Sequence, residues 1–395
     1  MRTKMANMSV LRIVASLLQK RASCSAVQVA RASSISSTPS DDVRFEKNAG
    51  VGIITLNKPR ALNALTHSMV IAMHNRIQGW ERDQTKLIIC KGTGDKAFCA
   101  GGDVVEIYRQ GKQPEGATGN DFFADEYRLN NRIHNLKIPY VALIHGITMG
   151  GGVGISVHGK YRVATEKSMF AMPETAIGLI ADVGGSYFLP KLKNHLGTYL
   201  ALTGNRLTGV DVKIAGIATH FVDSSQIRQL ESDLISVGYP SDNDVKSILE
   251  LYDKAGELQR NAKFSLADNL SKIDSIFGKA TVEEILDALK EDGSEWTQKL
   301  LETLSKMSPT SLKLVMKQLQ LGKKKSLAEC LNMEYRVVSR LRQTDSDFFE
   351  GVRAKLVEKD NSPKWNPSRL EDVSDSLVDN YFAPFEDSFQ ELKLE

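Results

Sequence analysis

Cysteine is scarce in this sequence of 395 residues. There are four cysteines, and no two of them have the CxxC spacing of a redox or zinc pair. The HExxH pattern of zinc hydrolases is also missing. Scattered cysteines of this kind are typical of proteins in reducing compartments, where disulfide frameworks are rare. We therefore expect no disulfide framework, no metal site and no resident cofactor.

Three motifs that would assign a common enzyme class are absent or incomplete. A GxxxxGK[ST] phosphate loop does not occur. The glycine cluster beginning at Gly150 does not complete GxGxxG, because Ile155 and Val157 occupy the sixth positions of its two frames. The GxSxG frame around Ser156 fails because His158 replaces its last glycine. These gaps argue against a P-loop enzyme, a Rossmann dinucleotide enzyme and a serine hydrolase.

Acidic residues are missing from the first forty positions. This segment has six basic residues, a group of serines and no Asp or Glu before Asp41. Arginine- and serine-rich segments without acids are typical of mitochondrial transit peptides, so we interpret residues 1–40 as one and expect a location in the mitochondrial matrix. A secretory signal fits less well because Arg12 interrupts the apolar run, and a disordered tail is the plain alternative.

The remaining chain has no excess of positive charge. The whole sequence has a formal net charge of +3, from 51 Lys and Arg against 48 Asp and Glu. Without the six basic residues of the first forty, 45 Lys and Arg face 48 acids, which gives a net charge of −3. A nucleic-acid partner would require a basic surface, so we expect none. No uninterrupted apolar run approaches the ~18 residues of a transmembrane helix, so we expect no membrane partner.

Residues 41–223 alternate between strand-like and helix-like patterns. Short apolar runs predict strands at Val43–Phe45, Val51–Leu56, Lys86–Lys91, Val141–Ile144 and Tyr161–Thr165. Apolar residues at helical spacing predict helices from Ala64 to Trp80 and over Phe122–Asn135. The alternation predicts an α/β layered domain with mostly parallel strands.

Helical periods dominate after Asp223. They predict helices over Ile227–Val237, Val245–Leu258, Val282–Leu289, Leu312–Gln320 and Leu327–Leu341. Thr281 and Glu284 have the spacing of a capping box, and Ser308 stands directly before a proline, so we expect helices to begin at these positions.

The stretch from Val141 to Pro190 combines the features of a reactive site. An apolar strand leads into Gly150–Gly152, and glycines at a strand-to-helix junction let backbone N–H groups approach an oxygen that develops negative charge. Downstream, Glu174 stands among apolar residues and Asp182 precedes a second glycine pair. Burying an acid is costly unless it is paired or functional. We therefore predict an oxyanion pocket with two acids beside it; for Glu174 an exposed loop position is the alternative.

Two further side chains are weaker candidates. Cys99 could be a nucleophile, but it has no local base, and a buried thiol beside a turn is the commoner role. His145 ends a predicted strand and could be a base, but a histidine bonded to backbone is the simpler interpretation.

Several motifs, taken in order, resemble those of one family. They are GIITLNKPRALNAL, KAFCAGGD, HGITMGGGVG, MPETAIGLIADVGGSYFLP, ALTGNRLTGVDVKIAGIATHFV and DFFEGVRAKLVEKD. Together they resemble the crotonase (enoyl-CoA hydratase/isomerase) superfamily, from about Val43 to about Trp365. The resemblance implies an α/β fold, a crotonase-like spiral of ββα repeats with a helical C-terminal region. It implies an acyl-CoA-binding core at 41–223, a helical region at 224–375 that completes the domain, and a tail at 376–395.

The resemblance also implies where an acyl-CoA substrate would bind. Backbone N–H groups of Ala100 and Gly151 match the pair that holds the thioester oxygen in this superfamily. The turn containing Arg60, Ala61 and Asn63 matches the segment that contacts CoA. CoA would then be part of the substrate and not a cofactor.

Acids of the chain match substrate-contacting positions of the superfamily. The implied acyl-contacting residues are Glu126, Gly151, Glu174 and Asp182. Of these, Glu174 and Asp182 would be the catalytic acids. Whether Glu174 attacks the carbonyl carbon or activates a water molecule stays open at this point.

One departure from the superfamily pattern bears on the reaction. Its hydratases use two glutamates, the first of them three residues after the middle glycine of the turn, where this chain has Gly154. The missing acid implies a thioester hydrolase, although Ala181 precedes Asp182 where those hydrolases have proline. The implied substrate is 3-hydroxyisobutyryl-CoA, from valine breakdown, with 3-hydroxypropionyl-CoA as a second one. Two alternatives remain: an enoyl-CoA hydratase or isomerase, and a non-enzymatic subunit of a mitochondrial assembly such as the ribosome. Whether the protein forms a homo-oligomer is left open.

Overall fold

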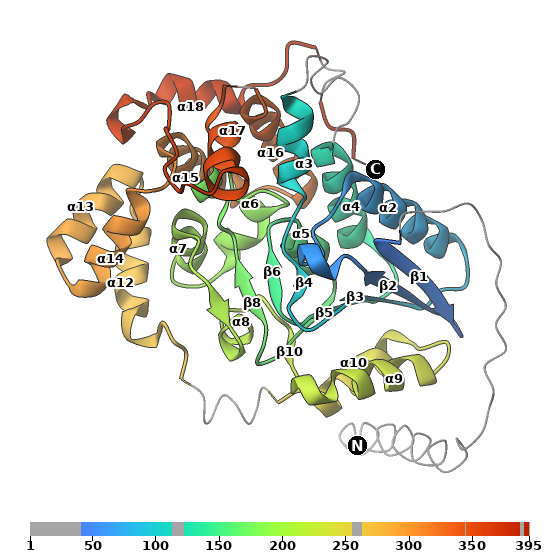
Figure 1. Ribbon diagram of the computed structural model, residues 1–395. Coiled ribbons are helices and arrows are strands. Elements are labelled where there is room, and N and C mark those ends of the chain that lie inside the picture. Colours follow the sequence, from blue (N-terminus) through green and yellow to red (C-terminus); the bar gives the residue numbers. More distant parts are fainter. Residues whose placement is uncertain (1–40, 113–121, 255–262, 344, 388–390, 395) are drawn as a thin grey trace.

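The computed structural model describes residues 41–112, 122–254, 263–343, 345–387 and 391–394 (Figure 1). The predicted transit peptide, residues 1–40, lies outside these ranges. The first described elements are β1 (Val43–Asn48) and β2 (Val51–Leu56), which pair antiparallel through the turn Ala49–Gly50. Both turn residues have positive φ, which matches the right-handed twist of a hairpin.

Within the described ranges, ten strands form two sheets. The larger sheet has the order β1-β2-β3-β5-β7-β10, where the further strands are β3 (Leu87–Gly92), β5 (Tyr140–Ile144), β7 (Tyr161–Ala164) and β10 (His220–Phe221). The smaller sheet contains β4 (Ala97–Cys99), β6 (Ile147–Met149), β8 (Met169–Ala171) and β9 (Leu207–Thr208). From β3 to β8, successive strands alternate between the two sheets, so the chain advances as a spiral. All pairs except β1–β2 and β8–β9 are parallel, which confirms the predicted α/β class.

The central strands are buried on both faces. In β3, Leu87 and Ile89 pack toward one apolar cluster, while Ile88 and Cys90 belong to the other. The first cluster is closed by α9 (Ile227–Ser236) and α10 (Asp242–Tyr252), which lie along the outer face of the larger sheet (Figure 1). Burial on both faces explains why these strands read as continuous apolar runs.

The rest of the core consists of helices and short turns outside the two sheets. These are α2 (His67–Arg82), α3 (Val104–Gly111), α4 (Phe122–Asn135), α5 (Gly151–Val157), α6 (Gly185–Phe188), α7 (Leu196–Thr203) and α8 (Val210–Ile214), with short turns η1 (Pro59–Ala61), η2 (Glu174–Ile177), η3 (Leu189–Lys191) and η4 (Ser224–Gln226). The predicted helix Phe122–Asn135 has the observed bounds, and α2 begins after its cap Thr66. Within the described ranges, no helix is both long and apolar enough to cross a membrane.

The C-terminal half is helical, as its sequence pattern predicts. Its elements are η5 (Ala267–Asn269), α12 (Leu270–Phe277), α13 (Val282–Asp292), α14 (Glu295–Leu304), α15 (Pro309–Gly322), α16 (Leu327–Leu341), α17 (Asp347–Val352), η6 (Arg353–Val357), η7 (Leu370–Asp372) and α18 (Asp375–Phe382). The capping box of Thr281 with Glu284 and the cap at Ser308 are confirmed. The helix predicted over Val245–Leu258 ends earlier, at Tyr252 in α10, and residues 255–262 lie outside the described ranges.

These C-terminal helices pack directly against the core. α16 contacts α4 and α6, α15 contacts α6, and α17 contacts η2 (Figure 1). Most of α18 lies in the segment expected to be a tail, yet it packs against α15 and α16 and buries Val378. The segments that carry the predicted acids therefore lie under the C-terminal helices.

Candidate active site

Two glycine turns meet at the centre of the site. Gly101, in the turn between β4 and α3, has φ of 117°, a conformation that favours glycine. A Cβ atom added at Gly101 would lie 3.7 Å from the backbone nitrogen of Gly151, the first residue of α5. The glycine turns predicted from the sequence are thus in contact.

Two of the predicted acids flank the second turn. A Cβ atom added at Gly151 would lie 2.2 Å from Oε1 of Glu126, and one added at Gly150 would lie 3.1 Å from Oε1 of Glu174. Glu126 comes from α4 and Glu174 begins η2 after Pro173. Both side chains are buried, and Oε1 of Glu126 and Oε2 of Glu174 have no hydrogen-bond partner within the described part of the chain. The structure therefore brings together Gly151, Glu126 and Glu174 and excludes the exposed alternative for Glu174.

Asp182 is held by a tyrosine that precedes it by 55 positions. The hydroxyl of Tyr127, next to Glu126 on α4, donates a hydrogen bond of 2.7 Å to Oδ2 of Asp182. The carbonyl of Ala181 accepts a bond of 2.8 Å from Nε2 of Gln318 on α15. Contacts on both sides therefore fix Asp182 although alanine, and not proline, precedes it.

The backbone after Asp182 adopts an unusual conformation. Val183 has φ of 51°, which a β-branched residue rarely adopts and which usually marks a functional site. His158 contacts the Val183 carbonyl at 2.7 Å, and because a carbonyl only accepts, the proton of His158 lies on Nε2. Buried Glu334 of α16 accepts bonds from the N–H groups of Gly184 at 2.7 Å and Ser186 at 2.9 Å.

Burial perturbs the pKa of all three acids, and Asp182 perturbs the other two electrostatically. Burial raises the pKa of Glu174 and of Glu126 well above the usual range, and the neighbouring Asp182 raises both further. Burial also raises the pKa of Asp182, to about 6, against the opposing effect of the bond from Tyr127. Acids with raised pKa in a buried site suit proton transfer near neutral pH.

One of the two predicted oxyanion donors is already engaged. The N–H of Gly151 begins α5, so no acceptor exists for it within that helix. The N–H of Ala100, however, donates to the carbonyl of Leu62 at 3.0 Å. Ala100 is thus not a free donor, and it can reach a second acceptor only by sharing its proton between two oxygens.

The predicted CoA-contacting residues are divided between surface and interior. Arg60 and Ala61 are exposed on η1, where they can meet a ligand. Asn63 is fully buried, and its amide nitrogen donates to the carbonyls of Ala97 at 2.8 Å and Thr93 at 3.1 Å. Its oxygen accepts a backbone bond as well, so the Asn63 side chain is engaged within the protein, and a CoA contact of this residue stays a prediction. This amide fixes the turn because its polar groups are used inside the protein.

The weaker candidates are not part of this acid cluster. Cys99 is fully buried, and burial raises the pKa of its thiol, which disfavours a nucleophilic thiolate. His145 bonds through Nδ1 to the hydroxyl of Thr165 at 3.0 Å, a side-chain partner where the sequence suggested backbone.

Sequence reasoning missed the residues that support the acids. They are Tyr127, His158, Gln318 and Glu334. Only Glu334 carries a readable signal, since it interrupts an otherwise apolar helix face with a charge. The others face the site through contacts between elements far apart in the chain.

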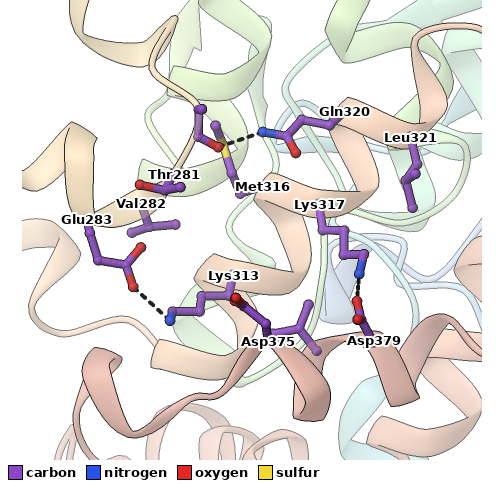
Figure 2. Close-up of a pocket in the computed structure, with 12 residues that line it drawn as sticks. Thr281, Val282, Glu283, Lys313, Met316, Lys317, Gln320, Leu321, Asp375 and Asp379 are labelled. Atoms are coloured by element: carbon purple, nitrogen blue, oxygen red, sulfur yellow. Dashed lines mark hydrogen bonds and ion pairs between the residues drawn. The ribbon is translucent and has the colours of Figure 1, made fainter.

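A separate groove of about 660 Å³ lies between α13, α15 and α18 (Figure 2). Figure 2 shows its charged side chains directed at each other: Lys313 lies 2.7 Å from Glu283, and Lys317 pairs with Asp379. Gln320 donates to a backbone carbonyl at 2.6 Å. None of the three buried acids lines this groove, so it does not belong to the reactive site.

The sequence profile of one family, described as enoyl-CoA hydratase/isomerase, matches residues 51–382. The chain belongs to the enoyl-CoA hydratase/isomerase family. Solved structures agree with this. A carnitinyl-CoA dehydratase from Mycobacterium thermoresistibile is similar with a TM-score of 0.81 and 37% identity, covering 90% of this chain and 99% of that one. An enoyl-CoA hydratase from Rhodobacter sphaeroides has a TM-score of 0.80 and 34% identity, covering 90% of this chain and 100% of that one. The crotonase-like fold expected from the motifs is confirmed.

Within the enoyl-CoA hydratase/isomerase family, two similar proteins have the same name. A mitochondrial 3-hydroxyisobutyryl-CoA hydrolase from Gallus gallus is 53% identical over 344 residues, covering 87% of this chain and 89% of that protein. The mitochondrial 3-hydroxyisobutyryl-CoA hydrolase of Homo sapiens is 50% identical over 343 residues, covering 87% of this chain and 88% of that protein.

Proposed function

We propose that this protein is a mitochondrial hydrolase that cleaves 3-hydroxyisobutyryl-CoA to 3-hydroxyisobutyrate and CoA in valine breakdown. Membership of the family supports an acyl-CoA substrate. The similar proteins that are named 3-hydroxyisobutyryl-CoA hydrolase match this chain over most of their length. 3-Hydroxypropionyl-CoA has the same hydroxyl position with one methyl group fewer, so we expect it as a second substrate.

The observation that carries this proposal is the space around Gly154. A Cβ atom added there would lie 2.8 Å from Oδ1 of Asn130 and 2.8 Å from Cβ of Val183. Real Cβ atoms do not approach neighbours this closely, so a longer side chain does not fit at 154 without moving Asn130 or Val183. The sequence has no second glutamate at this position, as hydration would use, and the surroundings would admit one only if Asn130 or Val183 moved.

The site supplies what thioester cleavage requires. The N–H of Gly151 faces the developing oxyanion, with the shared N–H of Ala100 as the second donor. Glu174 has an unpartnered oxygen and lies beside the Gly150 turn. In one route an oxygen of the ionised Glu174 attacks the acyl carbon, CoA leaves as the thiol with a proton carried by Asp182, and water then cleaves the anhydride. In the other, Glu174 takes the proton of a water that attacks the same carbon.

The remaining two acids serve the acyl group in this proposal. Glu126 lies against Gly151 and lines the pocket beside the carbonyl. Asp182 keeps Oδ1 available while Tyr127 occupies Oδ2, so it can accept a bond from the substrate hydroxyl or carry the proton to the leaving thiol. Arg60 and Ala61 contribute to the CoA-binding surface. The acyl-CoA substrate is bound without a further cofactor.

A thiol-release assay with a panel of acyl-CoA esters tests the function. We expect kcat/KM for 3-hydroxyisobutyryl-CoA to exceed that for isobutyryl-CoA by ~10⁴-fold, because a buried acceptor is left unpaired when the hydroxyl is missing. Equal rates on the two esters would indicate a general thioesterase. Hydration of crotonyl-CoA faster than thioester cleavage would indicate a hydratase.

A single turnover in oxygen-18 water distinguishes the two routes. Label in the peptide that contains Glu174 indicates water attack on the Glu174 carbonyl of an enzyme anhydride. General-base catalysis places the label in the product only, as does water attack on the acyl carbonyl of an anhydride. Hydroxylamine added during turnover would trap the anhydride and leave a modified Glu174, which provides a second readout.

A further inference from the structure

One buried amide next to the acids is not explained by the fold. Asn130 lies on α4 and is fully buried. Its Oδ1 and its Nδ2 both have no hydrogen-bond partner among the described residues. Leaving a buried amide without partners costs free energy, and such groups in native proteins generally have a partner that is absent or a functional role.

The position of Asn130 places this amide inside the reactive site. It follows Glu126 by four residues and Tyr127 by three, so its side chain neighbours each of them on α4. On α5, Gly151 lies against Glu126 and Gly154 lies against Asn130, so the two helices meet at two glycines that are three residues apart. The amide therefore lies one helical turn, about 6 Å, beyond the carboxylate that borders the Gly151 N–H.

The chemistry of the neighbouring groups explains why an amide is useful here. Oδ1 of Asp182 can only accept a hydrogen bond when ionised, so it satisfies the proton of a substrate hydroxyl but not its oxygen. Nδ2 of Asn130 is a donor, so it can supply the hydrogen bond that the oxygen of the substrate hydroxyl accepts. A Cβ atom added at Gly154 would lie 3.0 Å from Nδ2 of Asn130 and 2.8 Å from Cβ of Val183, so the amide borders the residue that follows Asp182.

We propose that Asn130 is a specificity-determining residue whose Nδ2 donates a hydrogen bond to the 3-hydroxyl oxygen of the substrate, while Asp182 accepts the hydroxyl proton. This inference rests on the proposed hydrolase function and assigns a role within it. The side chain holds the non-reacting end of the acyl group and takes no part in bond making.

Asn130→Leu tests this assignment, because leucine keeps the volume and removes both polar atoms. We expect kcat/KM for 3-hydroxyisobutyryl-CoA to fall about tenfold relative to kcat/KM for isobutyryl-CoA, the effect of losing one neutral hydrogen bond. The melting temperature should be equal to or above that of the wild type, because an unpaired buried amide is replaced by an apolar side chain. A purely structural asparagine would give the opposite change in stability.

Asn131→Leu is the matched control on the same helix. Asn131 is also buried, but its oxygen accepts a bond from Asn135 at 3.2 Å, and it lines a different groove. We expect this variant to leave the ratio of the two esters unchanged. An unchanged ratio in Asn130→Leu, or an equal loss on both esters, would overturn the role of Asn130 alone. Failure of the wild type to cleave the hydroxylated ester would instead overturn the proposed function, and the inference with it.

Discussion

The hydroxyl of Tyr127 donates a 2.7 Å hydrogen bond to Oδ2 of Asp182, and both side chains are buried. This bond connects α4, which also carries Glu126, to the strained segment around Val183. It favours the ionised form of Asp182 and opposes the effect of burial, and with both effects the pKa of Asp182 is about 6. The tyrosine thus helps to keep one acid charged at neutral pH beside two whose pKa values are raised well above the usual range.

Tyr127→Phe should therefore shift the pH dependence of hydrolysis. Removing the donor raises the pKa of Asp182 further, so the acidic limb of kcat/KM moves to higher pH by about one pH unit. Rates measured from pH 5 to pH 9 would show this, and Tyr239→Phe, an exposed tyrosine, is the control. An unchanged acidic limb would exclude Asp182 as the titrating group.

Glu174→Gln should keep the fold and lose most turnover. The amide preserves shape but removes the nucleophile or base, so thiol release should fall by ~10²–10⁴-fold. The exposed Glu291→Gln is the control and should retain activity. A Glu174→Gln protein within tenfold of the wild-type rate would remove this residue from the mechanism.

Gly151→Ala should lower activity, whereas Gly79→Ala should raise stability. The new Cβ at Gly151 would lie 2.2 Å from Oε1 of Glu126, so the carboxylate or the turn must shift, and we expect a loss of ~10²-fold in kcat. Gly79 lies in α2 with no atom within 4 Å of an added Cβ, so alanine there should stabilise the protein by ~0.5–1 kcal/mol. Urea unfolding and thiol release measure both. Full activity in Gly151→Ala would contradict the geometry of the turn.

Glu334→Ala should destabilise the protein and slow hydrolysis together. It leaves the buried N–H groups of Gly184 and Ser186 without an acceptor, at a total cost of ~3 kcal/mol. Because Gly184 and Ser186 lie shortly after Asp182 in the chain, kcat should fall. Glu334→Gln should recover part of the stability and part of kcat, since its side-chain oxygen still accepts hydrogen bonds. The exposed Glu302→Ala is the control. Normal kcat in a folded Glu334→Ala protein would show that Asp182 does not depend on this clamp.

Stability should fall as pH rises above 7. Burial raises the pKa of Glu334 from 4.5 to about 8, so the folded state holds a proton that the unfolded state has released. The free energy of unfolding then decreases from about pH 4.5 until the folded carboxyl has ionised. Buried neutral His158 has a lowered pKa, about 3, and acts in the opposite direction, but only below the ordinary histidine pKa of about 6.5.

Urea unfolding between pH 7 and pH 8.5 isolates the acids from this histidine contribution. The free energy of unfolding of the wild type should decrease with pH over this interval. The decrease should be less steep in Glu334→Gln, which has no carboxyl group at this position to titrate. A wild-type stability that increases over this interval would contradict a raised pKa for Glu334.

Local pattern was sufficient for much of the fold. The bounds of α4 and α16 follow from apolar spacing, and the cap of α13 follows from the pair Thr281 and Glu284. The strands were readable because parallel strands buried on both faces require uninterrupted apolar runs. The glycine turn at Gly150 and the isolated acid Glu174 also identified the region of the site, because glycine geometry and the cost of burying charge are local properties.

The tertiary structure alone decided how the acids are supported and which donors remain free. Tyr127 reaches Asp182, and Glu334 reaches Gly184, across 55 and 150 positions of the chain. Bonds between distant elements leave no periodic trace, because each partner satisfies only its own local pattern. The same reason explains the engaged N–H of Ala100 and the buried amide of Asn63, whose acceptors Leu62 and Ala97 lie far from them in the sequence. Sequence motifs thus indicated the residues of the site, but packing determined which of their polar groups face a substrate.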